Sequence, residues 1–498
     1  MCGIIGYMGS AAAAPTIYSG LSFLQHRGQD SAGIATLSGH RLFIEKGRGL
    51  ARDVFDDAKI SALHGTAGVG HVRYSTSGSA QALSEIQPFY VNHPFGITLT
   101  HNGNLVNQQE LAKYLEGENQ RHVNSDSDSE LLLNVLAQAI HLRMRGGAKA
   151  PDLFLDAVAD VHKHCTGAYA AVALIAGAGL LAFRDPRGIR PLSLGAHGGN
   201  EWLAASESAA FHPLHFENTG DIAPGEAVFI DLRGKAHRRK YAGASPRPCI
   251  FEYIYFARPD SHLDGALVYD ARVNMGRYLA AKIRRDYPHI RPDCVMPIPD
   301  SGRVTALEVS RELGVPYREG LVKNRHTGRT FIVPGQARRR RSVGEKLNVI
   351  APEFANKRVL LVDDSIVRGT TGAQLVGMAR VAGAKRVYFA SAAPPVRHPN
   401  VFGVDIATRG ELIAHGRNNA EITTHLGADD VVYQDMSDLV AAVRDAGGES
   451  SVFETSCFDG DYPDAMINEE YLQELEARRG GARDDDSSQL DLSLRTYS

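Results

Sequence analysis

The chain has 498 residues, of which 43% are hydrophobic and 22% charged, and its formal net charge is -3. This length exceeds what one hydrophobic core usually serves, so two or more domains are expected, and the near-average composition excludes a disordered or fibrous chain. The small net charge excludes a general attraction to nucleic acid, and no apolar run reaches the roughly 18 residues of a membrane span. The five scattered cysteines form no CxxC pair, so we expect a reduced, cytoplasmic protein without a disulfide framework.

The first half, residues 2–240, contains short apolar runs that end in turn signals, namely VGHVRYST, FGITLTHNGNL, AYAAVALIAG, GLLAFRD and EAVFIDL. These runs predict antiparallel strands. Helical periodicity interrupts them at YSGLSFLQHRG and SDSELLLNVLAQAIHLRM. In the second of these, Ser125, Asp126 or Ser127 could cap the start, and Ser127 with Glu130 has the spacing of a capping box. Sheets with helices beside them predict a layered α+β domain.

The second half, residues 255–460, has a different pattern. DCVMPIPD, KRVLLVDD and KRVYFASAA are continuous apolar runs near helical patterns such as RVTALEVSRELG and GAQLVGMARVAG. Continuous apolarity predicts strands that are buried on both faces, hence an α/β domain with a parallel sheet. Residues 461–498 are expected to form a C-terminal helix and a mobile tail.

Cys2 is the first candidate catalytic residue. A small second residue favours removal of Met1, which would leave a thiol and a free α-amino group on one residue. Their reference pKa values, about 8.5 and about 8, make proton transfer between them nearly thermoneutral, so the amine can act as the base for the thiol. The alternative is that Cys2 is only a small start residue, and the first three residues alone do not decide between the two.

Three later stretches favour the catalytic interpretation. LQHRGQDSAGI places Arg27 in a turn after a helix, GHVRYSTSG ends a strand at Arg73, and THNGNL puts Asn102 and Gly103 after a strand. Each also has a structural explanation, since Asn-Gly is a strong hairpin signal and Arg73 could be a solvated cation at a sheet edge. A tight turn can still expose a backbone N–H beside a side-chain amide, which is the donor pair that an oxyanion requires.

In this order, MCGIIG, LQHRGQDSAGI, HVRYSTSG, HNGNL and SDSE resemble the glutaminase domain of the N-terminal nucleophile amidotransferases. The resemblance implies an N-terminal nucleophile hydrolase fold for residues 2–240. It also implies that six residues form the glutamine site: Cys2 as the nucleophile, Asn102 and Gly103 as oxyanion donors, Arg73 and Asp128 as partners of the α-carboxylate and α-amino groups of glutamine, and Arg27 beside the nucleophile. One fixed cation and one fixed anion suit a zwitterionic amino acid.

The stretch KRVLLVDDSIVRGTTGAQL contains a second set of candidate residues. An apolar run ends in Asp363 and Asp364, and a loop from Gly369 to Gly372 opens a helix. In a doubly wound sheet, ligands lie at the carboxyl ends of the strands, where adjacent carboxylates suit ribose hydroxyls and Mg2+ and the N–H groups of such a loop suit a phosphate. The alternative, that Asp364 and Ser365 only cap a helix, explains one residue but not the combination.

The same stretch resembles the phosphoribosyl-pyrophosphate (PRPP) motif of the type I phosphoribosyltransferases, and PIPDSGR and VKNRHTGRTFIVPGQ support the resemblance. It implies one Mg2+ ion per subunit near Ser301, Asp363 and Asp364. It further implies nine residues that bind PRPP: Lys323, Arg329, Asp363, Asp364, Ser365, Gly369, Thr370, Thr371 and Gly372. The run Arg338 to Arg341 lies in a segment that closes over PRPP in this family, and we expect it to be solvated charge rather than a nucleic-acid site.

Together the two halves resemble the family of glutamine phosphoribosylpyrophosphate amidotransferases. The resemblance implies an enzyme that transfers the amide nitrogen of glutamine to PRPP, giving 5-phosphoribosylamine, glutamate and pyrophosphate in the first committed step of de novo purine nucleotide synthesis. It also implies a homotetramer, feedback inhibition by purine nucleotides, a closed passage for ammonia, and slow glutamine hydrolysis without PRPP. Neither a nucleic acid nor a membrane is expected as a partner.

Two features favour the branch of the family that lacks a propeptide and an iron–sulfur cluster. Cys2 directly follows Met1, and of the four cluster-ligand positions only two hold cysteine, Cys249 and Cys457, while Asn400 and Glu454 stand at the others. Two other interpretations are disfavoured. VLLVDDSIVRGTT argues against a sugar-phosphate aminotransferase or an asparagine synthetase, and the intact glutamine-site residues argue against a PRPP-sensing regulator without catalysis.

Overall fold

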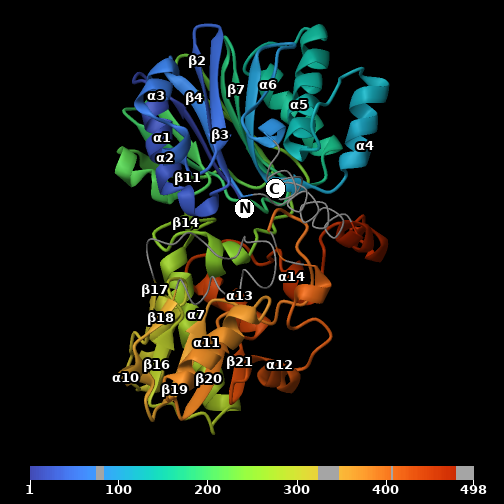
Figure 1. Ribbon diagram of the computed structural model, residues 1–498. Helices are drawn as coiled ribbons and strands as arrows, with labels where there is room; N and C mark the ends of the chain where they lie inside the picture. The colour runs from blue at the N-terminus through green and yellow to red at the C-terminus, as the bar shows by residue number, and fades with distance from the viewer. Residues whose placement is uncertain (75–82, 324–346, 405, 407, 478–498) are drawn as a thin grey trace, which may run out of the picture.

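The computed structural model describes residues 1–74, 83–323, 347–404, 406 and 408–477. Figure 1 shows two halves, one above the other: the upper half contains two stacked antiparallel sheets with helices on both outer sides, and the lower half contains one parallel sheet. The predicted order of an α+β part followed by an α/β part is confirmed. Within the described ranges, no helix combines the length and the apolar character that crossing a membrane requires.

The first sheet has seven antiparallel strands in the order β11-β9-β10-β1-β4-β2-β3. They are β1 (Gly3–Met8), β2 (Ser31–Ser38), β3 (Arg41–Arg48), β4 (Ala67–Arg73), β9 (Ser193–His197), β10 (Glu201–Ala205) and β11 (Glu217–Asp221). Strand β1 is buried along its whole length between β4 and β10. Cys2 therefore directly precedes a strand whose position is fixed on both sides.

The second sheet has six antiparallel strands in the order β13-β12-β8-β7-β6-β5. They are β5 (Phe89–Val91), β6 (Ile97–Leu105), β7 (Gly167–Ile175), β8 (Gly179–Arg184), β12 (Glu226–Asp231) and β13 (Ala236–Lys240). The five runs that predict strands form β4, β6, β7, β8 and β12. Between the two sheets lies an apolar core that includes Ile4 and Val69 from the first sheet and Val172 and Leu174 from the second.

Helices cover both outer faces of this pair of sheets (Figure 1). They are α1 (Ala13–Phe23), α2 (Ala51–Val54) and α3 (Asp57–Ala62) on the side of the first sheet, and α4 (Gln108–Lys113), α5 (Asp128–Arg145) and α6 (Asp152–His164) on the side of the second. Ile17 and Leu21 of α1 join Ile5 of β1 in one apolar cluster, and Leu132 of α5 joins Leu99 of β6 in another. Burial of such side chains, worth about 1.5 to 3 kcal/mol each, holds the helices on the sheets.

The start of α5 differs from the prediction in one detail. Ser127 occupies the N-cap position, but its side chain makes no cap hydrogen bond. The Glu130 carboxylate instead accepts hydrogen bonds from the N–H of Asn124 (2.9 Å) and from the hydroxyl of Ser125 (2.5 Å). The predicted capping box is therefore wrong, because the Glu130 carboxylate bonds to Asn124 and Ser125 rather than to the N–H of Ser127.

The second half is built on a parallel sheet with the strand order β16-β19-β20-β21. Its strands are β16 (Cys294–Pro297), β19 (Arg358–Asp363), β20 (Arg386–Ser391) and β21 (Asp430–Tyr433). Its helices are α7 (Val268–Asp286), α8 (Arg303–Leu313), α10 (Ala351–Phe354), α11 (Thr370–Val381), α12 (Asn419–Leu426), α13 (Met436–Asp445) and α14 (Ser456–Asp459). Two short antiparallel pairs lie outside this sheet, β14 (His262–Leu263) with β15 (Ala266–Leu267) and β17 (Leu321–Lys323) with β18 (Leu347–Val349).

Strand β19 shows why continuous apolar runs form this sheet. Leu361 belongs to an apolar cluster with Leu375 of α11, whereas Leu360 belongs to a different cluster with Leu279 of α7 and Ala306 of α8. Both faces of the strand are therefore covered by helices, which a parallel sheet requires.

One apolar cluster joins the two halves of the chain. It contains Met1, Val106 and Ala168 from the first half together with Phe251 and Phe402 from the later part. At the other end of the chain, residues 469–477 are helical. The predicted mobile tail lies outside the described residues from 478 onwards.

Candidate active site

Cys2 lies where three segments of the first half meet. Its backbone N–H donates to Oδ1 of Asn102 (3.1 Å), its carbonyl oxygen accepts from Nε of Arg27 (3.0 Å), and its Sγ lies 3.7 Å from the carbonyl oxygen of Tyr74. Its side chain is partly exposed, whereas the other four cysteines are buried, and all five are free thiols. The fold thus brings two of the predicted site residues into direct contact with the predicted nucleophile.

Asn102 and Gly103 lie inside β6, so the prediction of a tight turn after a strand is wrong. Gly103 has a φ of +152°, and a Cβ at this position would lie 1.9 Å from the carbonyl oxygen of Ala168. Only glycine allows this close approach of two backbones. The Asn-Gly pair is therefore explained by packing within a sheet rather than by a hairpin turn.

Both donors expected of an oxyanion site are available at this position. Nδ2 of Asn102 is buried and has no hydrogen-bond partner among the described residues. Tyr169, the register partner of Gly103 on β7, directs its own N–H and carbonyl to Asp185. The pair is therefore a non-hydrogen-bonded one, and the N–H of Gly103 faces away from β7. A side-chain amide and a backbone N–H beside a thiol can stabilise the oxyanion of a tetrahedral intermediate.

Arg27 is buried in a short 3-10 turn, η1 (Gln25–Arg27), and its guanidinium pairs with two carboxylates. The partners are Glu207 at 2.5 Å and Glu252 at 2.8 Å, and Glu252 also lies 3.3 Å from Arg190. Sequence reasoning missed both glutamates. Each is a single acidic residue in a stretch without periodicity, and each reaches Arg27 only through folding of the distant chain.

The contribution of Glu207 to the free energy of unfolding should depend on pH, and this dependence tests the buried cluster. Burial alone would raise the pKa of its carboxyl, but the charges of His26 and Arg27 and the hydrogen bonds that it accepts lower the pKa far below its ordinary value of 4.5. A lowered folded-state pKa adds stability above the unfolded-state pKa, and this stability is lost as the pH falls below it. Glu207→Gln should therefore lower the free energy of unfolding by about 3 kcal/mol at pH 7.

At pH 4 the difference between Glu207→Gln and the unchanged protein should be smaller by about 1 kcal/mol, because the unfolded chain then takes up a proton at Glu207. Denaturant unfolding of both proteins at the two pH values measures this change. A difference that stays constant with pH would contradict a charged Glu207 in the folded protein.

Arg73 and Asp128 supply the opposite charges expected for a zwitterionic ligand. Arg73 ends β4, is buried, and donates to Glu85 over 2.5 Å, so the alternative of a solvated edge cation is wrong. Asp128 begins α5, and its Oδ2 accepts a hydrogen bond from the N–H of Leu105 in β6 (3.0 Å). This hydrogen bond fixes the carboxylate of Asp128 beside β6, the strand that contains Asn102.

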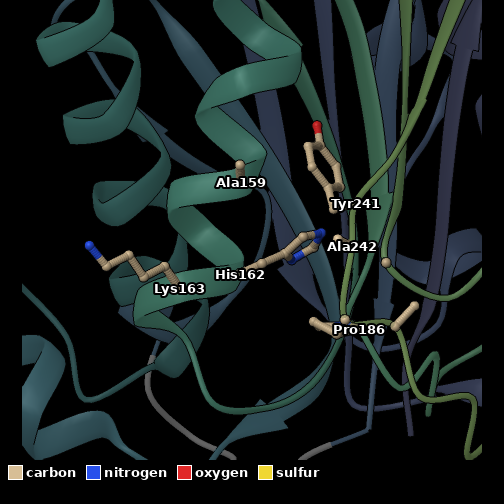
Figure 2. Close-up of a pocket in the computed structure, with 9 residues that line it drawn as sticks. Ala159, His162, Lys163, Pro186, Tyr241 and Ala242 are labelled. Carbon is tan, nitrogen blue, oxygen red and sulfur yellow. The ribbon is translucent and has the colours of Figure 1, made fainter.

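A separate pocket of about 470 Å³ lies beside α6 and contains none of these residues (Figure 2). His162 and Tyr241 line it, and Figure 2 shows the side chain of Lys163 pointing away from the ring of His162. Burial lowers the pKa of His162 to about 4 and raises the pKa of Tyr241. The lining residues include no carboxylate for an α-amino group, so this pocket does not suit glutamine.

The carboxyl ends of β16 and β19 bring together the residues predicted to lie near Mg2+. Asp363 is the last residue of β19, and its Oδ1 accepts a hydrogen bond from the N–H of Asp364 (3.0 Å). The carboxylate of Asp364 accepts from the hydroxyl of Ser301 (2.5 Å), which follows the neighbouring strand β16, and from the hydroxyl of Ser365 (2.7 Å). Residues from two strand ends therefore form one cluster of oxygen atoms.

The charges and donors of this cluster fit a hard cation. Burial and the carboxylate of Asp364 raise the pKa of Asp363 well above its ordinary value. Mg2+ prefers oxygen ligands, usually keeps several waters and often takes further oxygens from phosphates. In the part of the chain that the structure describes, no group of three or more His, Cys, Asp and Glu side chains forms a complete metal site. A cation held jointly by the protein and a phosphate-bearing ligand suits this donor set.

The loop that follows Asp364 leads into α11. Gly369 is the N-cap residue with a φ of +75°, and a Cβ there would lie 2.3 Å from Cδ1 of Ile413. Residues 370–372 form the first helical turn, where free N–H groups and the helix dipole favour a phosphate. The alternative that Asp364 and Ser365 cap a helix is wrong, because α11 begins only at residue 370.

The two cations predicted to bind PRPP have different outcomes. Nζ of Lys323 lies 2.7 Å from Asp300, which belongs to the loop after β16, so this side chain is close to the predicted pyrophosphate loop. Arg329 lies outside the described residues, as does the run Arg338 to Arg341.

The four residues at the positions of iron–sulfur ligands lie together in the fold. Cys249 forms a β-bridge with Glu454, and Nδ2 of Asn400 donates to Oε2 of Glu454 (3.3 Å). Burial raises the pKa of Cys249 to about 12 and that of Cys457 well above its ordinary value. Iron–sulfur clusters are held by thiolates. Two thiols, an amide and a hydrogen-bonded carboxylate do not supply the four thiolates that such a cluster takes.

Comparison with known proteins matches both halves of the chain. Residues 71–213 match the family described as a glutamine amidotransferase domain, and residues 268–393 match the phosphoribosyl transferase domain. The amidophosphoribosyltransferase of Pseudomonas aeruginosa is 51% identical over 488 residues, with 97% of each chain covered. That of Escherichia coli is 50% identical over 485 residues, with 96% of each chain covered, and that of Saccharomyces cerevisiae is 44% identical over 509 residues, with 99% covered.

Solved structures agree with these matches over the whole fold. The glutamine PRPP amidotransferase from B. subtilis, solved in complex with ADP and GMP, superposes with a TM-score of 0.82 and 34% sequence identity. The match covers 94% of this chain and 98% of that one.

Proposed function

The chain belongs to the amidophosphoribosyltransferase family, and from this premise we propose which of its residues perform the family's reaction. The enzyme transfers the amide nitrogen of glutamine to PRPP, in the first committed step of purine nucleotide synthesis. Glutamate, pyrophosphate and 5-phosphoribosylamine are the products. One site must therefore release ammonia and another must use it.

Ammonia is released by Cys2, after Met1 has been removed. The freed α-amine takes the thiol proton, and Sγ attacks the amide carbon of glutamine. The amine then gives this proton to the departing nitrogen as the C–N bond breaks, which releases ammonia and leaves a thioester. Water hydrolyses the thioester to glutamate and restores the thiol. The contact of 3.1 Å between the Cys2 nitrogen and Oδ1 of Asn102 carries this proposal, because it leaves Nδ2 of the same amide beside the reacting atoms without another partner among the described residues. Nδ2 and the N–H of Gly103 then bind the oxyanion.

Three buried charges complete this site. Arg73 binds the α-carboxylate of glutamine and Asp128 binds its α-amino group, since charge-assisted hydrogen bonds of both signs orient a zwitterion. Arg27 keeps the carbonyl of Cys2 in place through the bond from its Nε. A glutamine analogue that alkylates the nucleophile, followed by intact-mass analysis, tests the assignment: the label should lie on Cys2 of a chain that lacks Met1, and a label on another residue would overturn it.

Asn102→Ala should lower kcat for glutamine hydrolysis about 10² to 10³-fold, because one of two oxyanion donors is lost. The KM for glutamine should change little, because the α-carboxylate and α-amino partners stay in place. Steady-state kinetics with glutamine and, separately, with ammonia measures the effect, and synthesis from ammonia should stay near that of the unchanged enzyme. Asn107→Ala is the control, because it removes hydrogen bonds to His164 and Thr166 outside the site.

Ammonia is used at the carboxyl edge of the parallel sheet. Asp363 and Asp364 face the ribose hydroxyls of PRPP and, with Ser301, would hold one Mg2+ per subunit, which would supply positive charge for the departing pyrophosphate. Residues 369–372 bind the 5-phosphate through the first turn of α11, next to Ser365. Lys323 and Arg329 serve as cations for the phosphates of PRPP.

The remaining assignments rest on the family and on composition. The glutaminase domain spans residues 2–240, the phosphoribosyltransferase domain residues 255–460, and residues 461–498 form a C-terminal extension. The enzyme works in the cytoplasm as a homotetramer without an iron–sulfur cluster, and purine nucleotides inhibit it. The complex of the B. subtilis relative with ADP and GMP supports the last point.

A further inference from the structure

The second half of the chain directly contacts β6, the strand that contains Asn102 and Gly103 and is called the oxyanion strand below. Strand β5 pairs with residues 97–99 of β6, and beyond them side chains rather than a strand meet this edge: Gln87 bonds to the backbone of His101, and Asp128 accepts from the N–H of Leu105. Segment 400–404 lies against β6 there. Nδ2 of Asn104 donates to the carbonyl oxygen of Val401 (2.8 Å), and the next contact along the segment is between Gly403 and Gly103.

The contact at Gly403 is between two backbones. A Cβ on Gly403 would lie 2.8 Å from the carbonyl oxygen of Gly103, 2.9 Å from its carbonyl carbon and 3.2 Å from its Cα. Gly403 also has a φ of +94°, which side chains with a Cβ rarely allow. No larger residue fits here unless the backbone at Gly103 moves.

Segment 400–404 is itself held firmly. Oδ1 of Asn400 accepts hydrogen bonds from the N–H groups of Phe402 (2.8 Å) and Val404 (3.2 Å), and Nε of Arg190 donates to the carbonyl oxygen of Phe402 (2.9 Å). These four residues are buried. Arg190 also pairs with Glu252, and Glu252 pairs with Arg27. The Nε of Arg27 donates to the carbonyl oxygen of Cys2. One set of contacts thus reaches both the nucleophile and the oxyanion strand.

We propose that segment 400–404 is a positioning element for the glutaminase reaction. It presses on the backbone of Gly103 and so keeps the N–H of this residue and Nδ2 of Asn102 directed at the oxyanion. This inference rests on the proposed oxyanion role of Asn102 and Gly103. If the inference holds, the first half contains all the groups of the glutamine site, but the second half is required to keep these groups in the reactive geometry.

Gly403→Ala tests the proposal, because its only new atom would meet the backbone of Gly103. We expect glutamine-dependent kcat to fall about 10- to 100-fold, the size of effect that a misplacement of up to about 1 Å causes. Synthesis from ammonia should stay within about twofold of the unchanged enzyme, since the PRPP site is not touched. Gly410→Ala is the matched control, because a Cβ on this exposed glycine meets no atom within 4 Å.

Two inhibitors distinguish positioning from a merely structural role. An aldehyde analogue of glutamine forms a tetrahedral adduct with the thiol and needs the oxyanion donors, whereas glutamate needs only the charges that bind its α-groups. Gly403→Ala should weaken the aldehyde by the same factor as kcat/KM and leave the affinity for glutamate unchanged. Asn104→Ala, which removes the bond to Val401 without adding atoms, should show the same pattern with a smaller loss.

Two outcomes would overturn the proposal: full glutamine-dependent activity in Gly403→Ala, or equal losses with glutamine and with ammonia. A selective loss in Asn102→Ala without one in Gly403→Ala would refute only the positioning role. If neither variant lost glutamine-dependent activity, the oxyanion assignment itself would be wrong.

Discussion

Replacement of Cys2 by serine is expected to lower glutamine-dependent synthesis of 5-phosphoribosylamine by about 10⁴-fold or more, the scale seen when an enzyme loses its nucleophile. The reason lies in proton affinity. A serine hydroxyl is far less acidic than a thiol, so an α-amine with a pKa near 8 cannot generate useful amounts of the alkoxide. The loss should appear almost entirely in kcat, because the groups that bind the α-carboxylate and α-amino groups of glutamine are unchanged.

Synthesis from ammonia at alkaline pH should persist in Cys2→Ser, because the nucleophile does not take part in the attack on the ribose carbon. Cys294→Ser is the matched control. It changes a buried thiol at the start of β16, at the end of this strand away from the PRPP loop, and should keep both activities. If Cys2→Ser lost the glutamine and ammonia reactions to the same extent, the enzyme would not have two separate sites.

The double substitution Asp363→Asn with Asp364→Asn should have the opposite pattern. Loss of both carboxylates removes the oxygen cluster at the end of β19, and we expect the affinity for PRPP in the presence of Mg2+ to fall about 10³-fold or more, the size of effect caused by losing buried charge-assisted contacts. Both PRPP-dependent reactions should fail. Basal hydrolysis of glutamine should remain, because the hydrogen bonds of Cys2 in the described structure go to Asn102, Tyr74 and Arg27 and not to these two residues.

Titration calorimetry with PRPP and Mg2+, together with a glutaminase assay, measures both effects. Asp293→Asn is the control at the opposite edge of the parallel sheet. Asp293 directly precedes β16 and pairs on the surface with Arg358, the first residue of β19, so it should matter little for binding. If PRPP affinity survived in the double variant, these aspartates would not be part of the PRPP site.

The fold could be predicted where local sequence patterns match local burial. Continuous apolarity in KRVLLVDD predicted a strand with both faces covered, and Leu360 and Leu361 do pack in different apolar clusters on opposite faces of β19. The pattern failed at Asn102 and Gly103. There the same dipeptide that favours a hairpin turn serves a close approach to Ala168 inside a sheet, and no local signal distinguishes the two.

The candidate site was only partly predictable for a related reason. Cys2, Arg27 and Asn102 were recognised because short ordered motifs contain them, and the structure places them in contact. Glu207 and Glu252 were missed, because the need for a carboxylate arises from the burial of an arginine elsewhere in the chain. Burial of a charge is a property of the folded molecule, and its partner can come from any segment that reaches it.

The dependence of the glutamine site on Glu252 and on segment 400–404 has a consequence for protein synthesis. The amino-terminal half leaves the ribosome first and can begin to fold before the rest of the chain exists. At that stage it contains Cys2, but it lacks Glu252, which pairs with Arg27, and segment 400–404, which lies against β6. A nascent chain should therefore hydrolyse glutamine slowly until the second half, which uses the released ammonia, has been translated.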